Sequence, residues 1–453
     1  MIDLESGRAG RWLDAVGLDT PRARAWALYD WANSAFSTTI ASAVFPVYFT
    51  SVAAAGLGES AAFGRWSLIN SLALAISAVL APLLGTIADR LGATRKLLLG
   101  FTGLGVVATA LLYFVGPGDQ LPGAVIFMVG VIGFSSATVF YDALLTSAAS
   151  AGKADLLSSA GYAMGYLGGG VLLAVNVVMI ARPAWFGLAA GDPANSVNSP
   201  AARLSFVTVA VWWALFTVPL MRKVRSHTDD AVHAAGATPP PLGRVVRESW
   251  GQLRATLTHV GRYRDLFVFL IAFWLFSDGI GTFQTEAAAY GKSLQLPSTA
   301  LIGALLMTQF VGVPFSFAFG ALAVRIGARR ALLGGLWAYL FISGAAYFLS
   351  QTWHFFALAF AVAIVQGGTQ GLSRSLFASL VPRGMSAEFF AFFSVSSKFA
   401  GILGPLSIYL ITWAGYSSRV AILVLVALFA VSIAVLTKVD FTRGQAVAEA
   451  AAI

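Results

Sequence analysis

The sequence contains no cysteine and only four histidines among its 453 residues. Without cysteine there are no disulfides, thiol nucleophiles or thiolate metal ligands. Three histidines share one polar stretch near the middle of the chain, and His354 stands near the end of an apolar run, so the pattern supports neither an intramembrane metal site nor a serine–histidine pair. A Walker-type phosphate loop is also missing, which excludes ATP as a direct energy source. We therefore expect no enzyme activity, no metal and no cofactor.

Charged residues are scarce as well. They make up 11% of the chain, whereas hydrophobic residues make up 58%. Soluble proteins carry about 25% charged residues, so much of this chain must face lipid. A chain of this length has room for about twelve spans of ~20 residues. The composition predicts an all-α membrane protein that crosses the bilayer many times.

Apolar runs along the chain predict twelve transmembrane helices, each long enough to cross a bilayer. They cover residues 25–50, 66–87, 97–115, 122–146, 157–181, 203–221, 266–289, 299–323, 331–349, 354–376, 387–413 and 418–437.

The basic residues predict the orientation of these spans. Residues 1–24 are polar and arginine-bearing, contain no cleavable signal, and are interpreted as a cytoplasmic tail. With this end inside, 23 of the 29 Lys and Arg residues fall on the inner side and five on the outer side. We expect both termini to be cytoplasmic. The pI near 9.9 reflects this bias, and we expect no nucleic-acid partner.

A basic turn occurs twice. Gly85-Thr-Ile-Ala-Asp-Arg-Leu-Gly-Ala-Thr-Arg-Lys returns as Gly320-Ala-Leu-Ala-Val-Arg-Ile-Gly-Ala-Arg-Arg, each copy between two apolar runs. Such duplication is typical of transporters built from two similar membrane-embedded halves. We expect two pseudo-symmetric six-helix bundles, residues 1–221 and 265–453, joined by a cytoplasmic linker at 222–264. Residues 242–260 of the linker have an apolar helical face and predict an amphipathic helix on the inner membrane surface; a solvated linker helix is the alternative.

Acidic residues inside the apolar runs are the main functional candidates, because an ionisable group at mid-bilayer costs at least ~2.5 kcal/mol. Asp30 has Asn33 one helical turn away, and we interpret both as solute or ion ligands. Asp278 occupies a loosely corresponding place in the second half, where a structural ion pair is an equal alternative. Asp142 lies nearer the inner surface. Glu286, near the outer end of its span, is interpreted as reaching the interface.

Further polar residues complete the predicted site. Lys398 is assigned to the cavity, where it pairs with an anionic solute group or with one of the acids, and Arg374 to an inner gate. Hydrogen bonds and stacking surfaces for a small solute are expected from Tyr29, Trp31, Tyr141, Gln366 and Gln370. The alternative for each is packing or interfacial anchoring.

Two glycine-bearing segments are interpreted structurally. The run Gly165-Tyr-Leu-Gly-Gly-Gly resembles a phosphate loop only superficially, because it lies mid-span without a following Lys-Ser/Thr. We expect it to allow close helix packing. Gly401, Gly404 and Pro405 predict a helix that bends.

The turn that begins at Gly85 resembles the signature loop of the major facilitator superfamily. This resemblance implies a cytoplasmic gate in which Asp89 faces a helix N-terminus and Arg90 and Arg95 form ion pairs nearby. In the second copy Val324 replaces the acid, so Arg325 is expected to act in a gate with fewer ionic contacts.

Finer motifs resemble the vacuole-effluxer-like (autophagy-related amino-acid permease) branch, whose fungal members are associated with amino-acid export from the vacuole. They are Trp-Ala-Leu-Tyr-Asp-Trp-Ala-Asn-Ser-Ala-Phe at 26–36, the glycine run at 165–170, Trp-Trp at 212–213 and Gln-Gly-Leu-Ser-Arg-Ser-Leu at 370–376. Asp142 departs from the branch, in which an uncharged Asn is expected after the Tyr. The acidic first span also resembles that of cation-coupled sugar symporters and their lysolipid-carrying relatives.

These features together predict a secondary active transporter with alternating access in the cytoplasmic (inner) membrane of a bacterium. We expect a monomeric symporter of a small polar or zwitterionic, amino-acid-like solute, coupled to H⁺ or Na⁺ through Asp30 with Asp142 or Asp278 assisting. The alternatives are a cation-coupled sugar or lysolipid carrier and, less favoured, a channel or an intramembrane enzyme.

Overall fold

The computed structural model describes residues 13–14, 17–150, 153–191, 195–226, 229–230, 243, 263–381 and 400–450, and the regular elements in these ranges are helices. They form two compact units. The first comprises residues 1–45 and 79–246, and the second comprises 46–78 and 247–453. The predicted linker at 222–264 lies almost wholly outside the described residues, and the predicted domain bounds remain a prediction.

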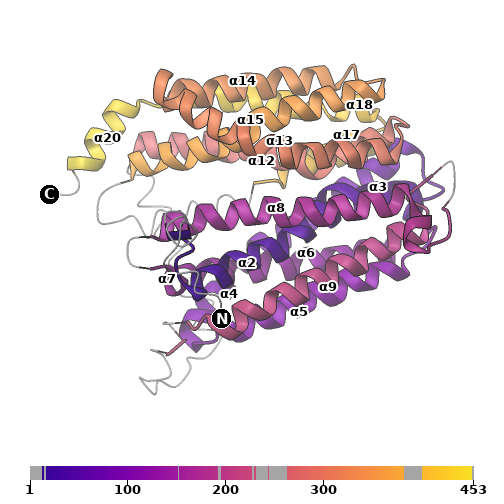
Figure 1. The fold of residues 1–453 in the computed structure, drawn as a ribbon. Helices are drawn as coiled ribbons and strands as arrows, with labels where there is room; N and C mark the ends of the chain where they lie inside the picture. The colour runs from indigo at the N-terminus through magenta and orange to yellow at the C-terminus, as the bar shows by residue number, and fades with distance from the viewer. Residues whose placement is uncertain are drawn as a thin grey trace. The chain divides into compact units, whose positions relative to one another are not determined.

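The first unit contains a bundle of helices, most of them long (Figure 1). These are α2 (Pro21–Ala35), continued by the π-helix η1 (Phe36–Ala43), then α5 (Thr94–Leu111), α6 (Gln120–Ala143), α7 (Leu145–Ala148), α8 (Ala154–Ala181) and α9 (Pro200–Lys223), with short 3-10 turns η3 (Leu112–Phe114) and η4 (Pro183–Phe186).

The second unit holds a further set of helices. They are α12 (Arg264–Ser293), α13 (Ser298–Ile326), α14 (Ala328–Ala346), α15 (Thr352–Leu380), α17 (Leu403–Trp413), α18 (Ser418–Ala421), α19 (Val424–Thr437) and α20 (Phe441–Ala450), together with η2 (Phe49–Ala53). Two elements cross the division of the chain: α3 (Val44–Tyr48), and α4 (Glu59–Leu91), whose residues up to Ala78 belong to the second unit.

Local signals explain where the helices of the first unit begin. Thr20 caps α2 by accepting a 3.1 Å hydrogen bond from the Ala23 N–H, and Pro21 follows as the first helical residue. Ser199 caps α9 in the same way, again followed by a proline. A side-chain acceptor and then proline is a strong start signal, because both suit the unpaired N–H groups of a first turn.

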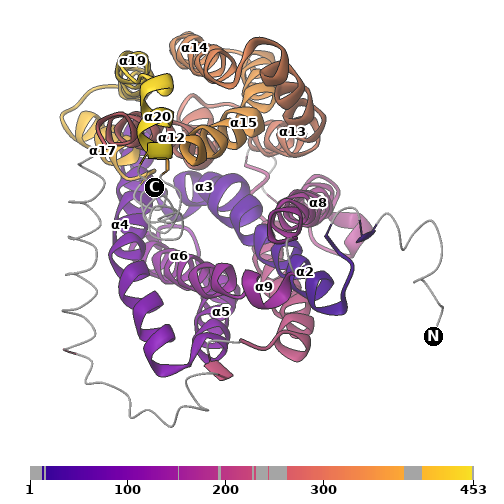
Figure 2. The ribbon, with the colours of Figure 1, turned by 90° about the vertical axis from the view of Figure 1, so that its left-hand side faces the viewer.

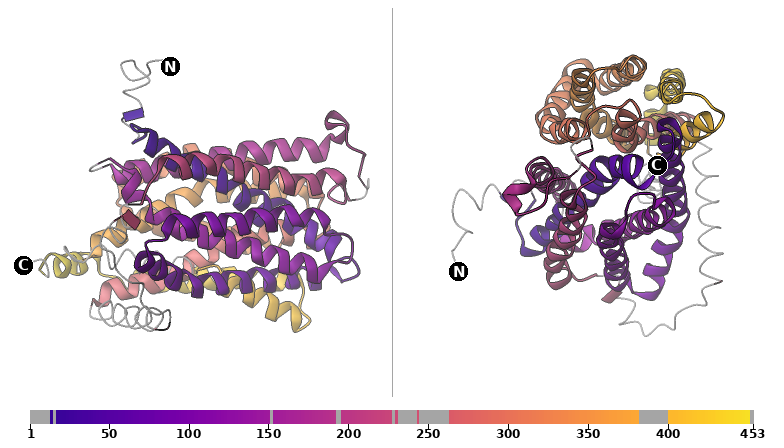
Figure 3. Two further views of the ribbon diagram at one scale, coloured as in Figure 1. Left: turned by 90° about the horizontal axis from the view of Figure 1, so that it is seen from below. Right: turned by 90° about the vertical axis from the view of Figure 1, so that its right-hand side faces the viewer.

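Small residues set the spacing of the helices in the first unit, where α2 packs against α8 and α9, and α5 packs against α6 and α9 (Figure 2, Figure 3). A Cβ on Gly133 of α6 would lie 2.6 Å from the Gly105 nitrogen of α5, so these two backbones approach closely. Trp213 of α9 is fully buried and packs against Phe36 at 5.6 Å between ring centroids. Close backbone contact of this kind is typical of helix packing in membranes.

The second unit is built around α13, α14 and α15, with α12 packed on α19 (Figure 2). Tyr339 of α14 and Phe429 of α19 stack face to face at 5.0 Å, and a Cβ on Gly279 of α12 would lie 2.7 Å from the same phenylalanine ring. The glycine therefore provides the room that the aromatic ring occupies.

The duplicated turn has a shared geometry. Gly92 separates α4 from α5 with φ of 56°, and Gly327 separates α13 from α14 with φ of 91°. Both values lie in the region that glycine adopts without steric cost. The two copies of the motif therefore place a helix-ending glycine at the same position, as a repeat requires.

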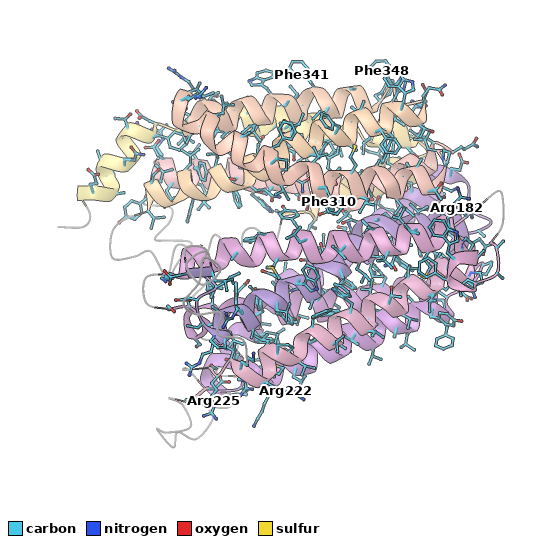
Figure 4. The ribbon with its side chains drawn as sticks, in the orientation of Figure 1. Arg182, Arg222, Arg225, Phe310, Phe341 and Phe348 are labelled. Carbon is cyan, nitrogen blue, oxygen red and sulfur yellow. The ribbon has the colours of Figure 1, made fainter. Side chains whose placement is uncertain are left out.

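Ten helices within the described ranges are long and apolar enough to cross a membrane. Of the other predicted spans, the one at 331–349 corresponds to α14, and the one at 387–413 is described as a helix only from Leu403 to Trp413. On α14, Phe341 and the neighbouring Phe348 point away from the unit and are 69% and 74% exposed (Figure 4). Large exposed aromatics suit a surface that lipid covers.

Basic residues gather at one end of the first unit. Arg222 and Arg225 lie at one end of the ribbon and Arg182 at the other (Figure 4). At the first end Lys153 pairs with Asp14 and Asp19 at 2.5 and 3.2 Å. This segregation fits the predicted topology, while the side on which the termini lie stays a prediction.

Candidate functional site

Asp30 lies on α2 in the first unit, half-buried, with a single hydrogen-bond donor among the described side chains. The Tyr141 hydroxyl of α6 donates a 2.9 Å hydrogen bond to its Oδ2 atom. The described residues place no Lys or Arg in an ion pair with it. A carboxylate with one neutral donor retains capacity to accept a proton, a cation or an ammonium group.

Aromatic contacts hold the Tyr141 hydroxyl in place. The Trp26 indole stacks on the Tyr141 ring at 4.3 Å and donates a 3.1 Å hydrogen bond to the Tyr141 carbonyl. Tyr29 also packs on the Tyr141 ring, at 4.8 Å; it is fully buried, and its hydroxyl shares a 3.0 Å hydrogen bond with Thr102. Tyr29 therefore supports the site through its ring, with its hydroxyl already bonded.

The glycine run of α8 approaches this part of α2 closely. A Cβ on Gly161 would lie 2.6 Å from Asp30 Oδ2, and one on Gly165 would lie 2.5 Å from the Ser34 hydroxyl oxygen. Gly168 would meet the Trp31 backbone at 2.4 Å. The interpretation of the run at 165–170 as a packing surface is confirmed, and Gly161, one turn earlier, leaves no room for a side chain beside Asp30.

Other predicted residues of the first unit lie around this cluster. Trp31 stacks on Trp212 at 5.5 Å and accepts a 3.1 Å hydrogen bond from that indole at its carbonyl. Its own buried indole N–H has no partner among the described residues. Asn33 is 4% exposed, whereas Asp142, at the last turn of α6, is exposed.

Asp278 lies in the second unit and is fully buried. Its Oδ2 atom accepts a 2.8 Å hydrogen bond from the Leu403 N–H, and its Oδ1 atom accepts a 2.7 Å bond from the Gly404 N–H. Helix α17 begins at Leu403, shortly after Gly401 with φ of 96°. Asp278 thus caps the first turn of a helix inside the membrane, a position that favours an anionic group. The predicted bend around Gly401 coincides with this helix start.

Glu286 corrects an interpretation made from the sequence. It does not reach an interface: its side chain is fully buried, 0% exposed. Ser67 Oγ lies 2.7 Å from its Oε2 atom, and the Asn70 amide donates a 2.9 Å hydrogen bond to Oε1. A residue near the end of an apolar helix is expected to reach the membrane interface, but α4 covers this part of α12 and buries Glu286. A signal was present in the Ser67-x-x-Asn70 spacing, which places two polar side chains on one face of an apolar helix.

The remaining predicted ligands belong to the second unit or lie outside the described residues. Gln366 of α15 is half-buried and Gln370 is exposed. Lys398 lies outside the described residues. Asp30 and Tyr141 belong to one compact unit, and Asp278 and the two glutamines belong to the other. A single cavity lined by all of them stays a prediction.

The predicted gate residues are described in part. Asp89 and Arg90 fall in α4 and Arg374 in α15, but their side chains lie outside the described part of the structure. Arg95 donates a hydrogen bond to the Met221 carbonyl at the end of α9. Arg325 is exposed at the last turn of α13.

Asp229 was not singled out from the sequence. Its carboxylate accepts hydrogen bonds from the Thr94 and Arg95 N–H groups, at 3.1 and 3.2 Å. A linker residue therefore caps the helix that follows the repeated turn.

Metal ions in proteins require a cluster of side-chain ligands. The His, Asp and Glu residues of the described part of the chain form no group of three or more that could hold a metal ion. The buried carboxyl groups of Asp278 and Glu286 are contacted by neutral groups. Such surroundings suit binding and conformational roles.

Comparisons with known proteins agree with this picture. The family described as vacuole effluxer Atg22 like matches residues 66–152 and 145–449. An uncharacterized MFS-type transporter of Bacillus subtilis, YxiO, is 37% identical over 421 residues, covering 92% of this chain and 94% of that protein. Autophagy-related protein 22 of Yarrowia lipolytica is 27% identical over 321 residues. Those residues are 65% of this chain and 51% of the fungal protein, so the match spans about half of the fungal length.

Solved structures share the fold. A D-xylose-proton symporter superposes with a TM-score of 0.67 at 16% identity, covering 94% of this chain and 98% of the other. The nucleoside transporter NupG gives 0.60 at 11% identity, with the same coverages. The family match and the bacterial relative together are decisive. This chain belongs to the vacuole effluxer Atg22-like family and is a multi-pass membrane transporter of the major facilitator superfamily.

Proposed function

We propose that this transporter moves a small polar or zwitterionic, amino-acid-like solute by alternating access, coupled to H⁺ or Na⁺ through Asp30. In this proposal residues 1–221 rock against residues 265–453, in the cytoplasmic membrane of a bacterium, and the protein acts as a monomer. The relative in Bacillus subtilis supports the bacterial location. The family description as an effluxer supports transport of a solute out of a compartment.

The observation that carries the proposal is the bond between Asp30 and Tyr141. Asp30 is half-buried, its Oδ2 atom is held at 2.9 Å by a fixed hydroxyl, and no Lys or Arg of the described residues neutralises it. A carboxylate in an apolar helix is costly unless it has a function or a partner. The ammonium group of a zwitterion, a proton or Na⁺ each supplies the missing positive charge.

Asp278 and Asp142 take secondary places in this proposal. The backbone N–H groups of Leu403 and Gly404 already occupy both oxygens of Asp278, which favours a structural role. Asp142 is exposed one residue beyond Tyr141 and places a second negative charge near Asp30. We therefore expect Asp30 to dominate coupling, with Asp142 modulating it.

A cation-coupled sugar carrier is the second candidate. The similarity to a D-xylose-proton symporter favours it, although at 16% identity this similarity speaks for the fold. A lysolipid carrier would need an apolar lateral slot between helices. A thermal-shift screen of amino acids, betaines, sugars and lysolipids separates these classes, because a ligand that binds the folded state raises the melting temperature by mass action.

Uptake into proteoliposomes tests the mechanism. The purified protein is reconstituted, and the solute selected by the thermal-shift screen is supplied with and without a proton or sodium gradient. We expect the gradient to drive accumulation in the wild type, and Asp30→Asn to lose accumulation while retaining exchange of labelled for unlabelled solute. Equal accumulation by wild type and Asp30→Asn would contradict coupling through Asp30. Asp440→Asn, at an exposed position in the second unit, serves as the matched acid control.

A further inference from the structure

A polar seam joins the first half of α4 to α12, α17 and α18 within the second unit. The Ser60 and Ser418 hydroxyl oxygens lie 3.1 Å apart, and the Ser71 hydroxyl donates a 3.0 Å hydrogen bond to the Ile402 carbonyl. The Trp66 indole donates a 3.2 Å hydrogen bond to the Thr285 carbonyl. A Cβ on Gly64 would lie 2.0 Å from the Thr412 hydroxyl oxygen, so the helices meet without space between them.

Glu286 lies in the middle of this seam. It is fully buried, and Ser67 and Asn70 of α4 contact its two carboxyl oxygens at 2.7 and 2.9 Å. Asn70 also donates a 2.8 Å hydrogen bond to the Thr285 hydroxyl. The described residues form no ion pair with Glu286. A charged carboxylate would be held here by three neutral side chains, those of Ser67, Asn70 and Thr285, with no water-exposed surface, and such an arrangement is energetically costly.

The Ser67 hydroxyl has only one hydrogen to donate, and this indicates that Glu286 is protonated. This hydroxyl lies 2.7 Å from Glu286 Oε2 and 3.0 Å from the Phe63 carbonyl, yet it carries one hydrogen. If Glu286 is ionised, its Oε2 atom and the Phe63 carbonyl oxygen are both acceptors, and they compete for the one hydroxyl hydrogen of Ser67. With Glu286 protonated, the acid donates to Ser67 and Ser67 donates to Phe63, so both short contacts are hydrogen bonds.

Asp278, two turns earlier on the same helix, shows the opposite arrangement. It accepts from two backbone N–H groups at the start of α17. These donors satisfy an anion, because they come from the positive end of a helix dipole. The same helix therefore carries one acid with donors for a carboxylate and one with a partner for a carboxylic acid.

We propose that Glu286 is a proton-binding residue whose protonated form closes the contact between α4 and α12, and whose proton release opens it. The proposal rests on the proposed function in one respect: opening and closing of this seam is one step of alternating access. The proton is bound at Oε2, shared with Ser67, and leaves to water when α4 withdraws. No other bond forms or breaks.

Other titratable groups near this end of the unit have partners of their own. The Arg419 guanidinium donates to the Tyr347 carbonyl at 2.6 Å, and the Tyr290 hydroxyl donates to the Ala346 carbonyl at 2.8 Å. Lys292 interacts with Glu59. Arg65 is exposed, and the His354 ring accepts from the Gln351 N–H at 3.3 Å. None of these groups is bonded to Glu286 in the described structure.

Cross-linking tests the proposal directly, because the chain has no native cysteine. The double variant Ser60→Cys/Ser418→Cys places two thiols where the hydroxyls lie 3.1 Å apart, and an oxidant links them when the seam is closed. Disulfide formation itself speeds up with pH because the thiolate is the reactive form, so each rate is divided by the rate of Glu286→Gln in the same background at the same pH. In proteoliposomes without solute, we expect this ratio to fall at least fivefold as the pH rises from about 5 to about 9, a range that covers titration of a buried carboxyl group. The rate of Glu286→Gln itself should change with pH only as the thiolate fraction does.

Matched variants identify the responsible group. Asp278→Asn, Glu59→Gln and His354→Asn in the double-cysteine background should keep the pH dependence of the parent. A ratio of parent to Glu286→Gln rates that does not change with pH overturns the proposal, because the two then share one pH dependence. The formed cross-link should also stop solute uptake, and reduction should restore it.

Infrared spectroscopy gives a second readout that needs neither solute nor movement. A protonated carboxyl group has its own C=O stretching band, which should be present near neutral pH and absent in Glu286→Gln while persisting in Asp278→Asn. If the band is the same in Glu286→Gln and the wild type, the proposal fails even when transport is demonstrated. If the band and the cross-linking behave as expected but no solute accumulates, the proton site stands and the proposed transport function fails.

Discussion

A Cβ placed on Gly161 of α8 would lie 2.6 Å from Oδ2 of Asp30 on α2, closer than non-bonded atoms approach. The same atom would lie 2.8 Å from the Trp26 ring, which stacks on Tyr141. Because Gly161 has no Cβ, Asp30 can occupy its observed position. The same space admits the Trp26 ring, which stacks on Tyr141 and thereby orients the hydroxyl that donates to Asp30.

Gly161→Ala should impair transport by displacing Asp30 and Trp26. Overpacking of this kind costs about 1–3 kcal/mol, and a displaced ligand lowers uptake by about tenfold for each ~1.4 kcal/mol. Gly103→Ala is the control, because a Cβ there meets nothing within 4 Å on α5. Uptake and melting temperature should be measured together; wild-type uptake by the Gly161→Ala variant would show that the contact is unimportant.

Asp278→Asn should lower stability more than solute affinity. The asparagine keeps one acceptor oxygen, so one of the N–H groups of Leu403 and Gly404 loses its partner. An unsatisfied buried donor costs about 1–3 kcal/mol. Thermal unfolding in detergent checks the stability and ligand-induced stabilisation checks the affinity. Asp440→Asn, at an exposed position in the same unit, provides the comparison. A large loss of affinity at unchanged melting temperature would assign Asp278 to the solute instead.

The Lys153 cluster should make stability depend on pH and salt. Burial tends to raise the pKa of Asp19, but hydrogen bonds from Ser150 and Lys153 outweigh it, so the pKa lies below the usual 3.8. Hydrogen bonds to Asp14 and Asp19 hold the pKa of Lys153 above its usual 10.5. The Asp19 contribution is complete above pH 3.8 and is lost as the pH falls through the lowered pKa. The Lys153 contribution is complete below pH 10.5 and is lost as the pH rises through the raised pKa.

Lys153→Met should therefore lower the melting temperature at neutral pH. The difference from the wild type should shrink with added salt, because these groups are accessible to solvent, and should shrink in acid as Asp19 becomes protonated. Melting curves across pH and ionic strength provide the measurement. A difference that persists unchanged at high salt would mean that Lys153 contributes through packing.

Arg443→Lys should loosen the C-terminal helix α20. The Arg443 guanidinium donates to both oxygens of Asp265, at 2.8 and 2.7 Å, and this hydrogen bonding raises the pKa of the arginine. Lysine cannot form the same two-pronged contact. We expect faster limited proteolysis at residues 441–450 with little change in the global melting temperature. Equal proteolysis rates would indicate that α20 is held by Phe441, which packs on Phe269.

Much of the fold is predictable from this sequence, because the bilayer imposes long apolar helices and short basic turns. The repeated turn was recognised from residue types, and its two glycines both have positive φ values. The glycine run of α8 was also interpreted correctly, because four small residues in six leave few other purposes inside a membrane. Asp30 and Tyr141 were singled out as candidates, although their hydrogen bond was not.

The polar residues were harder to assign. Glu286 was placed at the interface because it is near the end of its apolar run, but Ser67 and Asn70 cover it from 219 and 216 residues away in the chain. Asp278 was expected to bind solute or ion or to form an ion pair, and in the structure it caps a helix that begins 125 residues later. Asp229 was not considered, because its role depends on where the linker meets α5.

Composition and apolar length by themselves determined that this protein is a helical membrane protein, because both follow from the energetics of a chain in lipid, and the duplicated turn indicated a transporter. The tertiary structure alone decided what surrounds each buried acid. Asp30, Asp278 and Glu286 look alike in sequence, but their partners differ. Asp30 is bonded to a tyrosine hydroxyl, Asp278 to two backbone N–H groups, and Glu286 to a serine and an asparagine. Those partners come from distant helices, and the state of a carboxyl group depends on what surrounds it.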